Sequence, residues 1–224
     1  MDKQLILETL KKAKETSPKR NFKQAIDLIM VLRGLDLKKP EQNVNTFLNL
    51  HHGIGRKISV CALVGAELIP QAKEVCDEVI SDQEFDKYKV KKDVRKLAEK
   101  HDYFIAQANI MPKIATVFGR VFGPKGKMPN PKAGCVVPPN ANLKPVYERL
   151  QKLVRLQTKN QAVVQNKVGI EDQNEDEVAD NILTIYNAVK AALPQGDQNI
   201  KSVMIKLTMS PAVKIGKQAE AEKK

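Results

Sequence analysis

The side chains best suited to acid–base or metal chemistry are scarce in this chain. The histidines and cysteines are His51, His52, His101, Cys61, Cys76 and Cys135. The cysteines are odd in number and lack CxxC spacing, which is typical of reduced thiols in a cytosolic protein. No cysteine or carboxylate completes a metal set around the histidines at ligand spacing, and no Ser/His/Asp order stands out. The sequence therefore predicts no catalytic site, no metal and no cofactor.

Two glycine-containing segments resemble phosphate-binding motifs only in part. In GPKGKMP the residue five before Gly126 is Val121, and Lys127 is followed by Met128, so the spacing of a phosphate loop fails. HHGIGRK, residues 51–57, lacks the third glycine of a dinucleotide-binding fingerprint. A nucleotide-handling enzyme remains a hypothesis for the middle of the chain, but neither motif supports it.

Positive charge is the chemical feature that the sequence offers most clearly. The formal net charge is +12, and residues 103–147 and 198–219 contain no acidic residue. The acids gather elsewhere, for example in EDQNEDEVAD at 171–180. A solvated surface without a partner would mix the two signs more evenly. The separation favours a phosphate-rich partner, because binding by clustered Lys and Arg releases counterions.

The composition also limits which kind of nucleic acid is expected. The chain has no Trp, and aromatic residues make up 4%, so it lacks the aromatic strands on which bases stack. A folded basic protein of this kind is expected to recognise structured RNA by its shape, through backbone and hydroxyl contacts. No apolar run approaches the roughly eighteen residues that span a bilayer, so no membrane partner is expected.

The hydrophobic patterns predict two kinds of structure. Near the ends, residues 21–34 and 200–209 alternate like half-buried strands, and 44–50 is short enough and close enough to pair with the first of them. In the middle, the apolar run 57–65 is followed by alternating helices and strands, with a Gly/Pro-rich loop at 123–140. Neither end can form a covered sheet alone. We expect a discontinuous α+β domain formed by residues 1–56 and 154–224, with a three-layer, Rossmann-like α/β domain inserted at 57–153.

Five segments together resemble one known family. They are NFKQAIDLIMVL, LHHGIGRKISV, GPKGKMPNPKAG, VGIEDQNEDEVADNI and IKLTMSPAVKIG. In order and approximate spacing they are similar to successive blocks of the L-one family of large-subunit ribosomal proteins, the protein of the mobile lateral stalk. The PKRNF and PPNANLKP segments look more like the archaeal branch. The fold of that family, two domains with the first built from both termini, agrees with the organisation predicted from the patterns.

The resemblance implies a primary RNA site at the strand ends of the terminal domain. Its residues would be Phe22, Lys23, Lys167, Val168, Gly169, Lys206, Thr208, Met209, Ser210 and Lys214. A strand end can offer a hydroxyl, backbone groups and a flat apolar side chain to ribose and phosphate. For Phe22 and Met209 the alternative is simple core packing, since apolar residues on strands are usually buried. Ser210 stands where the family has Gly, which would permit close backbone approach or an unusual φ.

The inserted domain is expected to make a second, weaker contact. Lys125, Lys127 and Lys132 lie in a stretch whose glycines and prolines would present them to tRNA or to neighbouring rRNA. A hinge between the domains is expected at Gly53 and Gly55 in one linker and at Val154 and Arg155 in the other. The last segment, KQAEAEKK, is expected to be a disordered extension.

The function that follows from the resemblance is structural. It implies a constituent of the large ribosomal subunit that binds rRNA at the stalk junction, supports stalk movement and release of deacylated tRNA, and represses its own mRNA. It implies a cytoplasmic, ribosome-associated protein that is a monomer when free and not an enzyme. The alternative is an RNA-binding regulator or RNA chaperone that acts away from the ribosome with the same surface.

Overall fold

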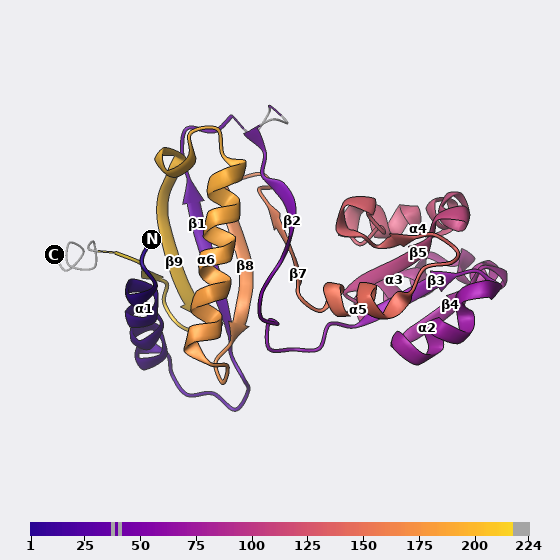
Figure 1. The fold of residues 1–224 in the computed structure, drawn as a ribbon, viewed down its shortest axis with the longest axis horizontal. Coiled ribbons are helices and arrows are strands. Elements are labelled where there is room, and N and C mark those ends of the chain that lie inside the picture. Colours follow the sequence, from indigo (N-terminus) through magenta and orange to yellow (C-terminus); the bar gives the residue numbers. More distant parts are fainter. Residues whose placement is uncertain (37–38, 40–41, 217–224) are drawn as a thin grey trace. The chain divides into compact units, whose positions relative to one another are not determined.

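The chain forms two compact units. The computed structural model describes residues 1–36, 39 and 42–216, and the extension expected from Lys217 lies outside these residues. The terminal unit comprises Met1–Arg56 and Lys152–Lys224, and the inserted unit comprises Lys57–Gln151 (Figure 1). Lys152 and Leu153, assigned to the insert from the sequence, lie in the terminal unit because the strand that begins at Leu153 pairs there.

A four-stranded antiparallel sheet forms the centre of the terminal unit, in the order β10-β9-β1-β8. The strands are β1 (Ala25–Leu32), β8 (Val163–Ile170), β9 (Ile200–Leu207) and β10 (Val213–Lys214). Its helices are α1 (Lys3–Thr16), α6 (Glu175–Ala192) and the short 3₁₀ turn η6 (Gly196–Asn199). Figure 1 shows α6 lying across one face of the sheet.

Alternation along β1 gives this sheet two different faces. Ile26, Leu28, Met30 and Leu32 are buried, whereas the residues between them are half-buried. The buried side chains of α1 and α6 supply the other half of this core. Burial of each large apolar side chain contributes about 1.5–3 kcal/mol, so the register of β1 is firmly fixed. The second face, which carries Asp27, is therefore the one that remains available to a partner.

The strand β2 (Asn45–Asn49) does not pair with β1, contrary to the expectation from the sequence. It pairs antiparallel with β7 (Leu153–Gln157), with Phe47 opposite Arg155. The physical reason is that both edges of β1 are already occupied by β8 and β9. The guanidinium carbon of Arg155 lies 5.5 Å from the centre of the Phe47 ring, which adds a cation–π contact to the ladder.

A parallel sheet in the order β4-β3-β5-β6 forms the centre of the inserted unit. The strands are β3 (Val60–Val64), β4 (Glu78–Ser81), β5 (Tyr103–Gln107) and β6 (Val136–Val137). The helices are α2 (Ile69–Val75), α3 (Lys91–Lys100), α4 (Met111–Lys125) and α5 (Leu143–Leu150). The 3₁₀ segments are η2 (Ala66–Leu68), η3 (Asp82–Lys89), η4 (Ala108–Ile110) and η5 (Pro131–Ala133). Helices α3 and α4 pack together and α2 packs with α5 (Figure 1), which confirms the predicted α/β class.

The core of the inserted unit explains why its strands are continuously apolar. All residues of β3 are buried, as expected for a strand covered on both faces. Under α3 and α4 the rings of Phe104 and Phe122 lie 4.2 Å apart, and Phe118 stacks beside Phe122. The loop expected from residue 123 begins later, because α4 continues to Lys125 and ends at Gly126, whose φ of 67° is left-handed.

Candidate nucleic-acid interface

Two large apolar side chains lie exposed at one end of the sheet in the terminal unit. Phe22, just before β1, and Met209, just after β9, each expose 52% of their surface. The core packing that the sequence left open for them is therefore wrong. The exposed cations Lys19 and Arg20 lead into Phe22 and were missed from the sequence. Apolar surface framed by cations suits ribose and base faces next to phosphate. We call Phe22, Thr208 and Met209, with Lys19 and Arg20, the turn surface.

Thr208 joins the two segments that carry these side chains. Its backbone N–H donates to the Ala25 carbonyl at 3.1 Å, and its Oγ1 accepts from the Ala25 N–H at 3.0 Å. The hydroxyl hydrogen has only a long contact of 3.4 Å, to the Ala25 carbonyl. Thr208 is exposed. Its hydroxyl can therefore still donate to a ribose or phosphate oxygen.

The buried side chain of Gln24 supports the backbone of the turn surface, a role that sequence reasoning missed. It is fully buried, and its Oε1 accepts from the Met209 N–H at 3.1 Å. Its Nε2 donates to Ser17 Oγ at 2.9 Å and to the Pro18 carbonyl at 3.2 Å. The Gln24 carbonyl accepts from the Glu171 N–H at 2.9 Å. One side chain and its own backbone thus connect the end of α1, the turn after β9 and the turn after β8.

The side chain of Ser210 has an internal role that the sequence did not predict, and its contact with RNA stays a prediction. Only 6% of its surface is exposed, and its Oγ accepts from the Leu207 N–H at 2.9 Å. The hydroxyl also lies 3.1 Å from the Pro211 carbonyl. Within the described residues no residue other than glycine has a positive φ, so serine fits this turn without strain. The serine side chain therefore closes the turn that presents Met209.

Val168 and Gly169 are also buried, so neither presents a side chain to a partner. Gly169 pairs with Ile26 in the sheet. A Cβ at Gly169 would lie 2.8 Å from Val178 Cγ2, closer than real side chains approach. The glycine allows β8 to pack against α6, and both residues act by placing Lys167 and the turn at Glu171.

Two of the predicted lysines flank a carboxylate on the open face of the sheet. Asp27 lies opposite Lys167 in the ladder between β1 and β8, and opposite Lys206 in the ladder between β1 and β9. Burial raises the pKa of Asp27, and the charges of Lys206 and Lys167 oppose that rise. The three side chains form a row across three strands with more positive than negative charge.

The remaining two predicted lysines differ in their surroundings. Lys23 Nζ lies 2.9 Å from Asp172 Oδ2, and both side chains are exposed. Such a surface pair contributes about 0–1 kcal/mol, so Lys23 can exchange this partner for a phosphate. Lys214 is half-buried on the edge strand β10, opposite Met204, and is therefore set back from the turn surface.

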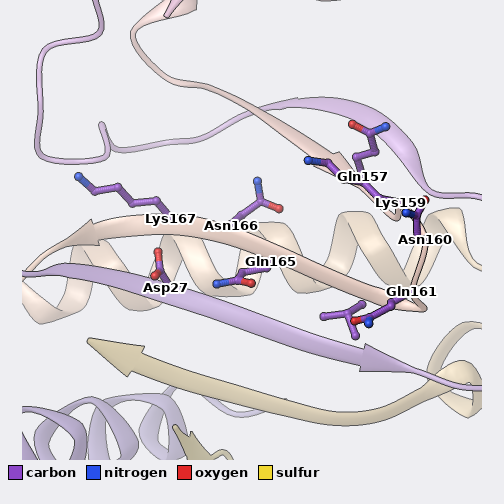
Figure 2. A pocket seen from close by; sticks show the side chains of 9 residues that line it. Asp27, Gln157, Lys159, Asn160, Gln161, Gln165, Asn166 and Lys167 are labelled. Atoms are coloured by element: carbon purple, nitrogen blue, oxygen red, sulfur yellow. The ribbon is translucent and has the colours of Figure 1, made fainter. Parts of the chain in front are cut away.

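A shallow groove extends the interface along β8. Figure 2 shows Lys167 and Asp27 at one end and Lys159 and Asn160 at the other. Its lining residues are Asp27, Gln157, Lys159, Asn160, Gln161, Val163, Gln165, Asn166 and Lys167. Nearly all are polar, and Asn166 Oδ1 is buried without a partner among the described residues. Its volume of about 620 Å³ suits a nucleotide-sized group. The amide-rich run QTKNQ at 157–161 is the signal that sequence reasoning passed over.

The lysines predicted for the second contact are mostly engaged within the inserted unit. Lys125 Nζ lies 2.8 Å from Glu99 Oε1. Lys127 Nζ donates to the carbonyls of Ala98 and His101, at 2.7 and 2.6 Å, where α3 ends. Lys127 thus satisfies carbonyls that the helix leaves unpaired. Only Lys132 is exposed and forms no side-chain bond within the described residues, so the predicted trio does not act as one cationic cluster.

The four predicted hinge residues all have defined contacts inside the terminal unit. The Gly53 carbonyl accepts from Gln173 Nε2 at 2.9 Å. Gly55 has a φ of 77°, and a Cβ there would lie 2.4 Å from Ile170 Cγ1, so only glycine fits. Val154 and Arg155 lie within the β2–β7 ladder. The chain passes between the two units at Arg56–Lys57 and at Gln151–Lys152, outside the four predicted residues, and a hinge stays a prediction.

The inserted unit offers little to a nucleotide at the usual place. In open α/β sheets that place is the carboxyl end of neighbouring strands where the strand order reverses, here β3 and β5. Gln107 Oε1 accepts from the Gly65 N–H at 2.7 Å and occupies this position. Glu67 lies beside it, within 3.5 Å of Gln107 Nε2, where its charge would repel a phosphate. The described residues also contain no group of three or more His, Cys, Asp or Glu able to hold a metal ion.

One further structural observation concerns membranes. Among the residues that the structure describes, no helix has both the length and the apolar character needed to cross a bilayer.

Comparison with known proteins gives consistent matches along the chain. Residues 10–211 match the model of the Ribosomal protein L1p/L10e family. The large ribosomal subunit protein uL1 of Methanocaldococcus jannaschii is 39% identical over 225 residues, which cover 100% of both chains. The proteins of the same name from Pyrococcus abyssi and Thermococcus kodakarensis are 40% and 39% identical over 216 residues, with 96% of this chain and 96% and 98% of theirs covered.

Proposed function

Because the chain belongs to the ribosomal protein L1p/L10e family, we propose that it binds a junction in large-subunit rRNA at the lateral stalk through the turn surface of its terminal unit. The family confirms the resemblance seen in the sequence and makes this protein a structural constituent of the large ribosomal subunit, not an enzyme. Its place is on the ribosome in the cytoplasm. The family also implies binding to rRNA.

The observation that carries the proposed site is the exposure of Phe22 and Met209. Folding would bury side chains of this size if they served the core alone, yet each exposes 52% of its surface. Hydrogen bonds to the side chains of Gln24 and Thr208 hold the adjoining backbone in place without a partner. A preorganised surface loses less conformational freedom on binding, which favours affinity.

The groove along β8 fits the same proposal. Lys167 and Lys206 lead from the turn surface onto the open face, and the amides of the groove can donate to and accept from ribose hydroxyls and base edges. Such contacts distinguish RNA from DNA through the 2′-hydroxyl. The primary interface is therefore larger than the strand ends that the sequence indicated.

Three finer functions rest on the family alone and belong to the proposal. They are participation in stalk movement and release of deacylated tRNA, repression of the protein's own mRNA through an imitation of the rRNA site, and a monomeric state when free. Repression would use the same surface as rRNA binding, so a variant that loses rRNA should lose the mRNA as well. Co-sedimentation with large subunits separates this proposal from an RNA regulator that acts away from the ribosome.

A binding titration of the full chain with a stalk-junction rRNA fragment tests the site. We expect Phe22→Ala and Met209→Ala each to weaken binding about tenfold, equivalent to about 1.4 kcal/mol. Matched controls are Leu5→Ala and Val90→Ala, which also remove large exposed apolar side chains but lie elsewhere. Equal losses in all four variants, or none in the first two, would contradict the proposal.

A further inference from the structure

Helix α3 presents a cluster of cations that neither the core nor the primary site uses. Its inner side chains Val94, Leu97 and Ala98 are buried in the core of the inserted unit. The opposite side carries Lys91, Lys92, Arg95 and Lys96, all exposed. Residues four apart lie about 6 Å apart along a helix, on nearly the same side, so these side chains form two short columns. We call these four residues the α3 face.

The α3 face brings together on one helix four cations that are unpaired among the described residues, whereas several other cations of the inserted unit are held by carboxylates. Lys57, Lys87, Lys113 and Lys125 each lie within ion-pair distance of a carboxylate, and Lys100 pairs with Glu78. By contrast, none of the four side chains of the α3 face forms a hydrogen bond or ion pair with another described residue. Their charge is thus available to a partner.

The acidic groups on the same helix do not neutralise this face. Glu99 is held by Lys125, whose hydrogen bond lowers the pKa of that carboxyl, and the charge of Arg95 adds to the effect. Asp93 is half-buried in the first turn. Lys91 and Lys92 also occupy the first turn, where the helix dipole disfavours cations. Helix stability therefore does not account for their presence.

We propose that the α3 face binds the phosphate backbone of an RNA duplex and supplies the second RNA contact of this protein. The inference deepens the proposed function, because the partner is taken to be rRNA or tRNA on the ribosome. It replaces the lysine trio at 125–132, of which two members are engaged internally. RNA is favoured over an acidic protein because four adjacent cations match a row of phosphates, each of which releases counterions when it is neutralised.

A generic RNA hairpin without the stalk-junction sequence serves as the probe, and the full-length chain as the protein. The first variant replaces the α3 face by Lys91→Gln, Lys92→Gln, Arg95→Gln and Lys96→Gln. The matched control removes as many exposed charges elsewhere in the same unit, by Lys73→Gln, Arg120→Gln, Lys132→Gln and Lys144→Gln. Gln has nearly the helix propensity of Lys and Arg, so both variants should fold. All proteins also carry Phe22→Ala and Met209→Ala, which weaken the turn surface.

We expect the α3 variant to bind the hairpin about tenfold more weakly. The slope of log affinity against log salt concentration should become shallower by the equivalent of about two to three phosphate contacts. The control should lose less than about threefold, as expected when scattered charges act only at long range. Equal losses would overturn the inference, because they would indicate general charge attraction. A loss of polyglutamate binding with unchanged hairpin binding would also overturn it, in favour of an acidic protein partner.

A second measurement locates the contact directly. Acetylation of lysines in the otherwise unmodified full chain, followed by mass spectrometry, should show Lys91, Lys92 and Lys96 protected by the hairpin while Lys73 and Lys144 are not. Uniform reactivity would contradict the proposal. Failure of this inference leaves the Phe22 and Met209 titration with junction rRNA unaffected, and failure of that titration leaves the protection pattern unaffected. The two proposals therefore fail separately.

Discussion

The turn after β9 and the region from the last turn of α4 onward invite comparison, because both combine Pro, Lys and small residues and both were predicted to bind RNA. In the first, buried side chains such as Gln24 and Ser210 hold the backbone, and Met209 remains exposed. In the second, Lys125 and Lys127 are themselves the groups that hold the structure. A basic residue in a Gly/Pro-rich stretch is thus available to a partner only where the fold does not already use it.

Among the variants that test this comparison, replacement of Gln24 should have the largest effect on stability and on RNA affinity. Gln24→Ala leaves the Met209 N–H and the Pro18 carbonyl without their partner, so we expect the free energy of unfolding to fall by about 1–3 kcal/mol. Affinity for junction rRNA should fall by more than about tenfold, because the turn surface loses its support. Denaturant unfolding and a binding titration measure the two effects. Gln195→Ala, at an exposed position of the same unit, should change neither, and unaltered binding by Gln24→Ala would remove the distinction between the two regions.

Replacement of Lys127 should affect stability without affecting the primary RNA site. Lys127→Met keeps much of the apolar stem but removes two charge-assisted bonds, to the carbonyls of Ala98 and His101 at the end of α3. The free energy of unfolding of the inserted unit should therefore fall by about 1.5–3 kcal/mol. Hydrogen exchange of the amides in β3 and β5 measures this loss. Affinity for the junction should stay within about twofold of the original value. The control is Lys132→Met, which should alter neither quantity; weaker junction binding by Lys127→Met in a stable insert would return Lys127 to the RNA site.

The hydroxyl of Thr208 allows a sharper test of the turn surface. Thr208→Val preserves shape but removes the hydroxyl, and we expect rRNA binding to weaken by about 1–3 kcal/mol if the hydroxyl reaches a buried RNA group. Stability should change less, because water can replace the exposed acceptor of the Ala25 N–H. Thr208→Ser retains the hydroxyl and should retain most of the affinity. Similar losses in both variants would assign the effect to packing of the methyl group instead.

The smallest expected effect is a difference between the two units in how acid changes their stability. Burial alone raises the pKa of Glu78, but hydrogen bonds from Lys100 and His101 lower it below its ordinary value of 4.5. Glu78 therefore stabilises the inserted unit above about pH 4.5, and this contribution is lost as the pH falls through the lowered pKa. The pKa of Asp27 is raised instead, so protonation on acidification relieves a cost in the terminal unit.

Hydrogen exchange, corrected for intrinsic rates, measures this difference between β3 and β1. Acidification below about pH 4.5 should reduce protection in β3 more than in β1. Glu78→Gln should reduce the pH dependence in β3 and leave that in β1 unchanged. A larger loss in β1 than in β3 would contradict the assignment of opposite signs to the two carboxylates.

The sequence by itself determined the class of structure and the family. The alternation from Ile26 to Leu32 predicts a half-buried strand, and the continuous apolar run from Val60 to Val64 predicts a strand covered on both faces. Both patterns depend on which faces of a strand are buried, and that information is local. The charge separation predicted a phosphate-rich partner for the same reason, because it can be counted along the chain. The resemblance added the position of the turn surface.

Only the tertiary structure decided which residues of that surface are free to act. The bond from Met209 to Gln24 joins residues 185 positions apart, and that from Lys127 to Ala98 joins residues 29 positions apart. Likewise, β2 could not pair with β1 once β8 and β9 occupied its edges. Whether the side chain of a Lys, Gln or Ser bonds within the protein or remains free for a partner depends on donors and acceptors from segments distant in sequence. The local sequence pattern does not contain this information. Lys127 was therefore predicted as an RNA contact, and the role of Gln24 was not predicted.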